Sequence, residues 1–176
     1  MAEAQGKQPI PRWLQNAHDR YVNGTYCHTS KAGRKECEGK TPIDCSHWDH
    51  HTDNEAGFHL PYMKTEEMHS PKAAEFYDVT EARKNGKYLA GLGVKPGDKI
   101  LFPGHVGKVI SYNPSDGSGE FMGSQSSTGT AVTRFGPWAQ ATEFQMPTRF
   151  LRPKESTDPQ GILRRNDYVI PRYHTR

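Results

Sequence analysis

The sequence predicts an α+β fold in which N-terminal helices pack on a small antiparallel sheet. Apolar residues follow helical spacing in the first part of the chain, whereas short strand-like runs separated by turn signals follow from Asp98 onward. An α+β protein has its helices and strands in separate parts of the chain, and this order fits that class. The 176 residues are the usual length of one domain. We expect a helical region at 1–22, a main unit at 23–152, and a linker with a C-terminal arm at 153–176.

Three helices are expected before the strands. The apolar positions of residues 11–21 follow helical spacing, so a first helix should end at Asn23-Gly24. A polar loop should cover 26–40. A second helix should start at Asp44 and continue to Gly57, which places Cys45 in its first turn. A third helix should start at Ser70-Pro71 and run through Phe76 and Tyr77 toward Val79.

The second half of the chain reads as strands. Runs at 99–102, 106–112 and 120–123 are separated by Pro103-Gly104 and by the turn-rich segment 113–117. Two further runs are expected as edge strands, at 131–135 and 149–152. Residues 153–161 read as a linker, and 162–176 as an arm.

Composition limits the classes of function. Only 33% of residues are hydrophobic, and 17 Gly with 13 Pro indicate a loop-rich protein with a small core. The net charge of +3 comes from 23 basic and 20 acidic residues that are scattered along the chain, apart from a few C-terminal arginines. Nucleic-acid binding usually needs a concentrated basic patch with interleaved aromatic residues. We therefore expect no nucleic-acid partner.

The chain has three cysteines, Cys27, Cys37 and Cys45. Cys27 and Cys37 bracket a loop and would form a disulfide in an oxidising compartment, which would leave Cys45 as a free thiol. Three reduced thiols are the equally open alternative.

Cys45 and His105 are the candidate catalytic pair. A cysteine at the start of a helix gains a lowered pKa from the helix dipole, and a nearby histidine can take its proton. His105 stands at the start of a predicted strand, where its ring can face a neighbouring helix. A third polar group should orient the imidazole. The alternation along the next strand favours Gln125, and the alternatives are Ser124, Asn113 and Asp116.

Four short motifs around these residues occur in a recognisable order. They are Gly24-Thr25-Tyr26, Asp44-Cys45-Ser46, Pro96-Gly97-Asp98 and Gly104-His105-Val106-Gly107. In this order and spacing, over roughly residues 23–127, the chain resembles the NlpC-type papain-like cysteine peptidases and amidases, which are related to CHAP domains.

The resemblance implies a papain-like catalytic domain at 23–152, with Cys45 as nucleophile and His105 as base. It also implies that Tyr26, Asp44 and Ser46 hold the substrate amine or the oxyanion. The implied substrate is an amide bond in the peptide stem or cross-link of bacterial peptidoglycan, and no metal or other cofactor is needed. The chain departs from the family at residues 47–51, which are rich in histidine, and at Gln125, near which the family often has a third histidine.

The N-terminus has no apolar run of the length that a signal peptide needs, and no stretch reaches the length of a membrane span. We expect a protein made in the cytoplasm that does not insert into membranes. In combination with the resemblance, this is similar to the amidase effectors of type VI secretion. Such an effector would act in the periplasm of a target cell and would have a cognate immunity protein as partner. A phage or endogenous cell-wall lytic enzyme is the alternative.

Two rival functions remain. His47 and His51 are four residues apart, the spacing that places two imidazoles on one helical face for a metal-dependent hydrolase. However, Trp48 occupies the position where the zinc-protease motif has a glutamate. The second rival is a non-catalytic papain-like binding module, in which Cys45 is only a small buried side chain.

Overall fold

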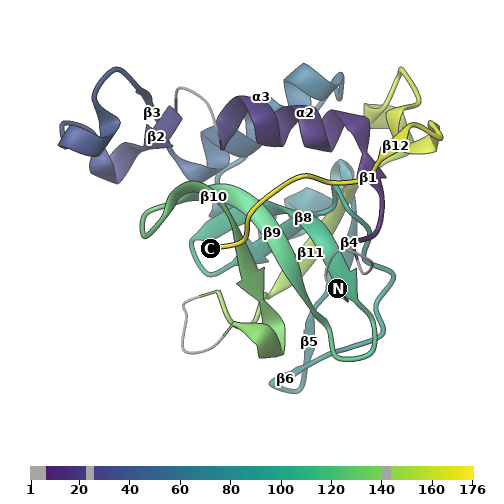
Figure 1. Cartoon of the computed structure of the whole chain (residues 1–176). Coiled ribbons are helices and arrows are strands. Elements are labelled where there is room, and N and C mark those ends of the chain that lie inside the picture. The colour runs from purple at the N-terminus through teal and green to yellow at the C-terminus, as the bar shows by residue number, and fades with distance from the viewer. Residues whose placement is uncertain (1–6, 23–25, 140–143) are drawn as a thin grey trace.

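The computed structural model describes residues 7–22, 26–139 and 144–176. The fold is mixed α+β, as predicted, with helices lying over one face of a strongly curved sheet (Figure 1). The α-helices of the described residues are α2 (Arg12–Tyr21), α3 (Cys45–Ala56) and α4 (Thr65–Met68). None of these helices is long and apolar enough to cross a lipid bilayer.

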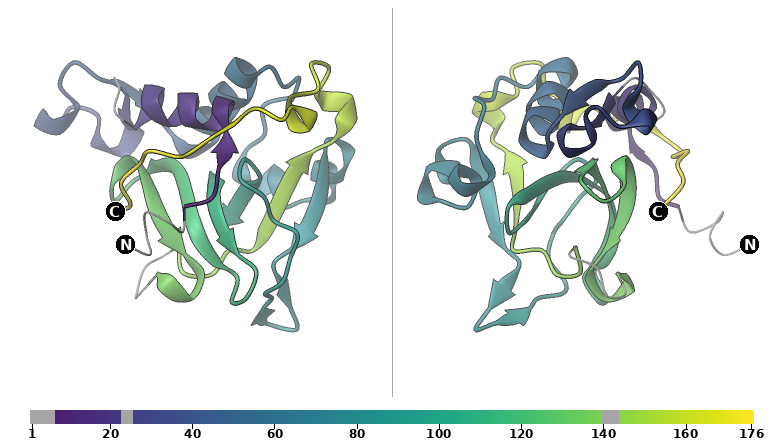
Figure 2. Two further views of the ribbon diagram at one scale, coloured as in Figure 1. Left: turned by 45° about the vertical axis from the view of Figure 1, so that its right-hand side comes forward. Right: turned by 90° about the vertical axis from the view of Figure 1, so that its left-hand side faces the viewer.

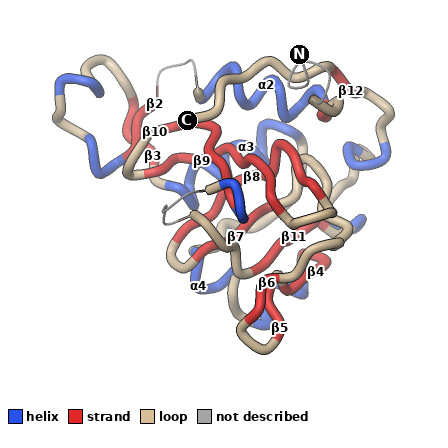
Figure 3. The backbone as a smooth tube through the Cα atoms, turned by 60° about the horizontal axis from the view of Figure 1, so that its bottom comes forward, coloured by secondary structure: helices blue, strands red, loops and turns tan. Residues whose placement is uncertain are grey.

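The main sheet of the described residues has six strands in the order β10-β9-β8-β7-β11-β4, and every neighbouring pair is antiparallel. Its strands are β4 (Tyr77–Glu81), β7 (Lys99–Phe102), β8 (His105–Asn113), β9 (Ser118–Gln125), β10 (Gly129–Phe135) and β11 (Arg149–Pro153). The four expected strands from 99 to 135 are therefore confirmed, with β10 at one edge. Figure 3 shows how these strands curl beneath the helices.

Three two-stranded sheets complete the fold of the described residues. They are β1 (Ile10–Pro11) with β12 (Tyr168–Val169), β2 (Tyr26–His28) with β3 (Thr41–Ile43), and β5 (Arg83–Lys84) with β6 (Lys87–Tyr88). The pairing of β2 with β3 is parallel. The predicted loop at 26–40 therefore begins with a strand and continues through two short 3-10 helices, Thr29–Lys31 and Lys35–Cys37.

Local sequence signals define both ends of α3. The Asp44 carboxylate accepts a hydrogen bond from the backbone N–H of His47 at 2.8 Å, so Asp44 is the N-cap. Gly57 ends the helix with a left-handed φ of 106°. The prediction of this helix is confirmed. The first helix, α2, also forms, but its predicted stop at Asn23-Gly24 lies outside the described residues.

The prediction of a third helix through Tyr77 to Val79 is wrong. Residues Pro71–Glu75 form a short 3-10 helix, and strand β4 follows directly. The alternation of Tyr77 with the β-branched Val79 suits a strand, and β4 pairs with β11 along its whole length. Strand β11 was expected at an edge but lies between β7 and β4.

The two faces of the sheet carry different cores. On the face covered by the helices, Ile110 and Met122 pack with Leu14, Tyr21 and Trp48. The opposite, concave face holds an aromatic cluster. Its rings are those of Phe102, Phe121, Phe135, Phe144 and Phe150. Because successive residues of a strand point to opposite faces, a one-residue step along β8 moves a side chain from one core to the other.

The C-terminal segment returns across α2 and ends beside the main sheet (Figure 2). Gln15 of α2 accepts a hydrogen bond from the backbone N–H of Arg172 at 2.9 Å and donates to its carbonyl at 3.1 Å. Tyr173 is buried and donates to Glu120 of β9 at 2.7 Å. Thr175 then forms an isolated bridge with Val132 of β10. The C-terminal segment is therefore docked on α2 and the main sheet, with Tyr173 buried in the core.

Candidate active site

Cys45 is the first residue of α3, and its thiol is free and half-buried. Its side chain packs against the core cluster that contains Leu101 and Val106. The backbone N–H of Val106 donates to the sulfur. Burial raises the pKa of the thiol, and the charges of Asp44 and Asp49 raise it further, which outweighs the effect of that N–H group. The thiol is therefore protonated at neutral pH in this conformation.

His105 begins strand β8, and its ring lies in the aromatic cluster of the concave face. Its centroid is 4.9 Å from that of Phe144 and 6.1 Å from that of Phe102. The residue is only 9% exposed, and Nε2 is buried without a hydrogen-bond partner among the described residues. Burial lowers the pKa of His105 to about 4, with a smaller contribution from His28. The imidazole is therefore neutral.

The thiol lies beside the backbone of Val106, the residue after His105, but the thiol and the imidazole face different sides of β8. Leu101 and Val106 are paired across the β7–β8 hairpin and face the helices, where Cys45 packs. Phe102 and His105 form the next pair and face the concave side. Among the described residues, no hydrogen bond joins Cys45 to His105. The sulfur instead contacts the backbone of the residue directly after His105.

Gln125 ends strand β9 and is fully buried. Its Nε2 donates to Oγ1 of Thr133 at 2.9 Å and to the carbonyl of Ala131 at 3.3 Å. Its Oε1 is buried without a partner in the described part of the chain. No hydrogen bond connects Gln125 with His105 there, so the role of Gln125 as the third partner stays a prediction.

The alternatives for the third partner are occupied elsewhere. Ser124 donates its hydroxyl to the carbonyl of Ile43 at 2.8 Å, which ties β9 to the strand before Cys45. Asn113 and Asp116 lie in and beside the turn that follows β8, at the opposite end of that strand from His105. The prediction of these two residues as alternatives is therefore wrong, because the length of β8 separates them from the imidazole.

A polar cluster surrounds the start of α3. Asp44 accepts hydrogen bonds from Nδ1 of His47 at 2.8 Å and from the hydroxyl of Ser46 at 3.2 Å. Burial raises the pKa of Asp44, but the hydrogen bonds from the His47 backbone and side chain outweigh it, so the net shift is downward. Ser46 also shares a hydrogen bond with the hydroxyl of Tyr62 at 2.8 Å, and the Tyr62 ring stacks on His47 at 4.5 Å. No motif or spacing in the sequence indicated that Tyr62 belongs to this site.

Tyr26 is placed by packing. Its ring lies 4.7 Å from that of Tyr21 and contacts the helix-side core. Tyr26 therefore belongs to the wall behind α3, and no hydrogen bond links it to Cys45 among the described residues. Gly24 and Thr25, which precede it in the motif, lie outside the described residues.

A buried ring of four charges fixes α3 on the β7–β8 hairpin. Lys99 Nζ lies 2.5 Å from Asp49 and 2.6 Å from Asp53, and Lys108 Nζ lies 2.7 Å from each of these two carboxylates. All four side chains are at most 3% exposed. Burial raises the pKa of Asp49, but the two ammonium groups outweigh it and hold it below its usual value. For Lys99, burial lowers the pKa, but the carboxylates hold it well above its ordinary value.

The sequence contains a signal for this ring. Asp49 and Asp53 are four residues apart on α3 and share one face of the helix, while Lys99 and Lys108 are directly paired across two strands. Because one end of the hairpin carries His105 and α3 begins with Cys45, the ring sets the position of both.

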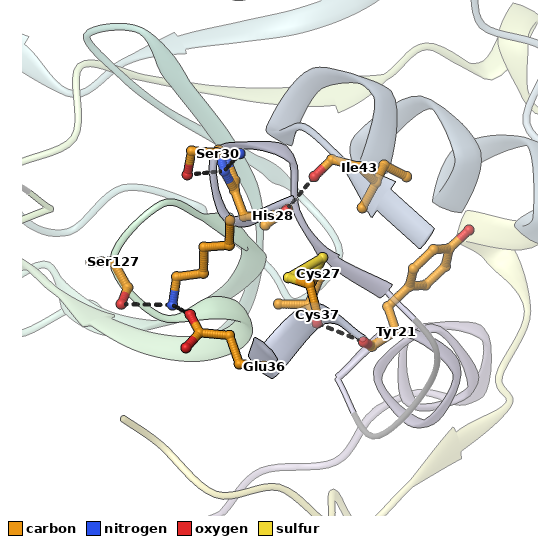
Figure 4. Close-up of a disulfide and its surroundings, with 11 residues drawn as sticks. Tyr21, Cys27, His28, Ser30, Glu36, Cys37, Ile43 and Ser127 are labelled. Atoms are coloured by element: carbon orange, nitrogen blue, oxygen red, sulfur yellow. Dashed lines mark hydrogen bonds and ion pairs between the residues drawn. A yellow bond between two sulfur atoms is a disulfide. The ribbon is translucent and has the colours of Figure 1, made fainter. Parts of the chain in front are cut away.

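Cys27 and Cys37 form a disulfide, with their Cα atoms 5.8 Å apart (Figure 4). Of the two alternatives for the cysteines, the structure shows the one that leaves Cys45 free. The disulfide anchors β2, which pairs with β3, and β3 leads directly into the cap of α3. In Figure 4, His28 lies next to the disulfide and faces Ile43 of the neighbouring strand.

A metal site would need at least three suitable ligands. Across residues 7–22, 26–139 and 144–176, no three His, Cys, Asp or Glu side chains are grouped so that they could hold an ion. His47 is engaged by Asp44, and His51 is exposed. The alternative that uses His47 and His51 therefore has no third ligand in this part of the chain.

No protein-family model, no curated protein and no solved structure matches the chain.

Proposed function

We propose that this chain is a papain-like cysteine hydrolase that cleaves an amide bond in the peptide stem or cross-link of bacterial peptidoglycan. One observation carries the proposal: the free thiol of Cys45 stands at the capped start of α3, against the backbone of the residue next to His105. The order of the four motifs supports the same assignment, since each resembles its counterpart in the NlpC-type enzymes.

In the proposed reaction, His105, the first residue of β8, reorients its backbone and side chain away from the concave side, and its imidazole accepts the proton of the Cys45 thiol. The thiolate adds to the amide carbonyl, and the backbone N–H of Cys45 donates to the developing oxyanion. His105 returns the proton to the leaving amine, which departs as the acyl-enzyme forms. A water molecule that is deprotonated by His105 then attacks the thioester, the bond between carbon and sulfur breaks, and the acid leaves as His105 returns the proton to the sulfur.

The substrate amine is proposed to lie over the polar cluster at the start of α3. Asp44 is partly exposed there and carries a negative charge, since its pKa is shifted downward. Ser46 is held by Tyr62 and can donate or accept next to the thiol. Gln125, one strand beyond His105, is the proposed orienting group, because its Oε1 has no hydrogen-bond donor among the described residues and can accept one.

Delivery into another cell is a second part of the proposal. The disulfide between Cys27 and Cys37 is suited to an oxidising compartment such as the periplasm. An antibacterial effector, neutralised by an immunity protein in the producing cell, fits this feature and the resemblance. A phage or endogenous lytic enzyme would carry out the same reaction.

A non-catalytic papain-like binding module is the second candidate. The observation in its favour is that Cys45 and His105 face opposite sides of β8, with the pKa of the thiol raised and that of the imidazole lowered.

Digestion of purified peptidoglycan separates the two candidates. We expect the wild-type protein to release peptides with new termini, identified by mass spectrometry, and Cys45→Ala to release none. His105→Ala should lose activity as well. His51→Ala changes an exposed histidine of α3, the helix that begins with Cys45, and should retain activity. Equal release by wild type and Cys45→Ala, or no release by either, would reject the hydrolase.

A further inference from the structure

A pocket of about 120 Å³ lies at the far end of α3 from Cys45. It is formed where the start of α2, the loop before β7, strand β11 and the C-terminal segment meet, near β1 and β12 in Figure 1. Ile162 lines it and lies against Gly57, the residue that ends α3. Because α3 has 12 residues, its two ends are roughly 17 Å apart, with Cys45 at one end and this pocket beside the other.

One wall of the pocket presents a rigidly held guanidinium group. Arg152 donates from Nε and one terminal nitrogen to the two oxygens of Asp98, at 2.8 and 2.7 Å, and to the carbonyl of Gly93 at 2.7 Å. Asp98 is 5% exposed and also accepts from the backbone N–H of Lys95. The second terminal nitrogen of Arg152 has no acceptor among the described residues, so it is positioned to donate to a ligand.

The other charges around the pocket leave an excess of positive charge. The second carboxylate of the lining, Asp167, is paired with Arg12 at 2.9 Å. Lys95 and Arg165 also line the pocket, and neither has an ion-pair partner in the described part of the chain. With both carboxylates already engaged, the pocket favours an anion.

The remaining walls are apolar and aromatic. Trp13 is fixed in place because its ring lies against Gly97, where a Cβ atom would come within 2.8 Å of it. Leu163 and the exposed ring of Tyr168 complete these walls. The ligand should therefore combine one negative group with a small apolar body. A dianionic phosphate is disfavoured, because the three cations of the lining, Lys95, Arg152 and Arg165, exceed its two carboxylates by only one charge.

We propose that this pocket binds the terminal carboxylate of a short peptide with small apolar side chains. Arg152 would donate to the carboxylate, Lys95 and Arg165 would supply the attracting charge, and the apolar walls would contact the side-chain methyl groups. The choice of a peptidoglycan stem peptide as the natural source rests on the proposed function, whereas the binding itself does not.

The test uses the full chain with Cys45→Ala, so that no probe is cleaved. The probes are N-acetyl-alanyl-alanine with a free carboxylate, its C-terminal amide, and inorganic phosphate. Binding is followed by NMR through the indole N–H signal of Trp13, which is assigned with Trp13→Phe. We expect the free acid to shift this signal saturably, the amide to bind at least tenfold more weakly, and phosphate not to displace the acid.

Substitutions then locate the site. Lys95→Ala combined with Arg165→Ala should weaken binding of the acid at least tenfold, whereas Arg164→Ala should leave it unchanged, because Arg164 points to Glu155. The inference is overturned if the acid does not bind, if acid and amide bind equally, if phosphate displaces the acid, or if the Arg164 variant loses as much affinity as the double variant. Since Cys45 is absent here, these outcomes are independent of peptidoglycan digestion.

Discussion

Cys45 is held as a neutral thiol by its surroundings. Burial, Asp44 and Asp49 all raise its pKa, and together they outweigh the N–H group of Val106. A thiolate is the reactive form toward alkylating agents. We therefore predict that the rate of alkylation of Cys45 by iodoacetamide rises with pH up to a midpoint above 9, the ordinary value for a thiol.

This rate can be measured by mass spectrometry on the peptide that contains Cys45. The wild-type chain needs no cysteine substitution, since Cys27 and Cys37 are joined. A plateau of reactivity that begins below pH 7 would instead show a preformed thiolate–imidazolium pair and would contradict the placement of His105.

His105 should make the folded state sensitive to acid. Its pKa is lowered to about 4 from an ordinary value of 6.5, so the unfolded chain binds a proton more readily between these values. Stability is therefore full above pH 6.5 and falls as the pH is lowered toward 4. From this shift we predict that the unfolding free energy falls by about 2 kcal/mol between pH 7 and pH 4.5 because of His105.

Urea unfolding of wild type and His105→Phe at both pH values isolates this contribution. The phenylalanine ring suits the aromatic surroundings and cannot be protonated. The unfolding free energy of the variant should therefore fall by about 2 kcal/mol less than that of wild type over this pH range. An identical pH dependence in the two proteins would show that the ring of His105 is solvated.

At the scale of elements, the buried charge ring joins α3 to the β7–β8 hairpin. Removal of one cation leaves two buried carboxylates with a single partner. We predict that Lys108→Met costs about 3 to 5 kcal/mol in unfolding free energy, as measured by urea denaturation. Lys72→Met removes an exposed partner of Glu67 and should leave the unfolding midpoint nearly unchanged. Similar small effects of both substitutions would argue against the ring.

The elements show what the sequence can and cannot predict. The extent of α3 follows from Asp44 and Gly57, and β7 to β10 follow from apolar runs and turn residues, because these signals are local. Strand β4 was missed since its partner β11 lies about seventy residues away in the chain, and pairing at that distance outweighs local helix propensity.

The candidate site shows the same limit. Cys45 at a helix start could be predicted from its cap, and His105 at a strand start from the preceding Pro-Gly. Which face of β8 His105 occupies depends on the phase of the strand relative to α3, and the charge ring sets that phase through Lys108. Tyr62 enters the site from an irregular segment, whose path is set by tertiary packing.

At the scale of the whole molecule, the C-terminal segment completes the core between α2 and the sheet. Tyr173 is 8% exposed and packs in the same cluster as Leu14 and Met122, whereas Tyr168 of the same segment is 46% exposed. We predict that Tyr173→Ala lowers the unfolding free energy by about 3 kcal/mol, because it leaves a cavity and Glu120 loses a donor. Tyr168→Ala is the matched control and should have little effect.

Circular dichroism during urea titration gives the unfolding free energies of both variants. If the two tyrosine substitutions have equal effects, the C-terminal segment is not docked on α2 and β9. If only Tyr173→Ala destabilises the protein, the segment is part of the single domain rather than a free arm.

In the proposed reaction, the sulfur of Cys45 forms a bond to the carbonyl carbon of a peptidoglycan peptide. Trapping of the acyl-enzyme tests it most directly: the protein is mixed with purified muropeptides, quenched in acid during turnover, digested, and analysed by mass spectrometry. We expect an added acyl mass on the peptide that contains Cys45 in the wild type, and none in Cys45→Ser. Turnover without any adduct at Cys45, or an adduct at another residue, would contradict it.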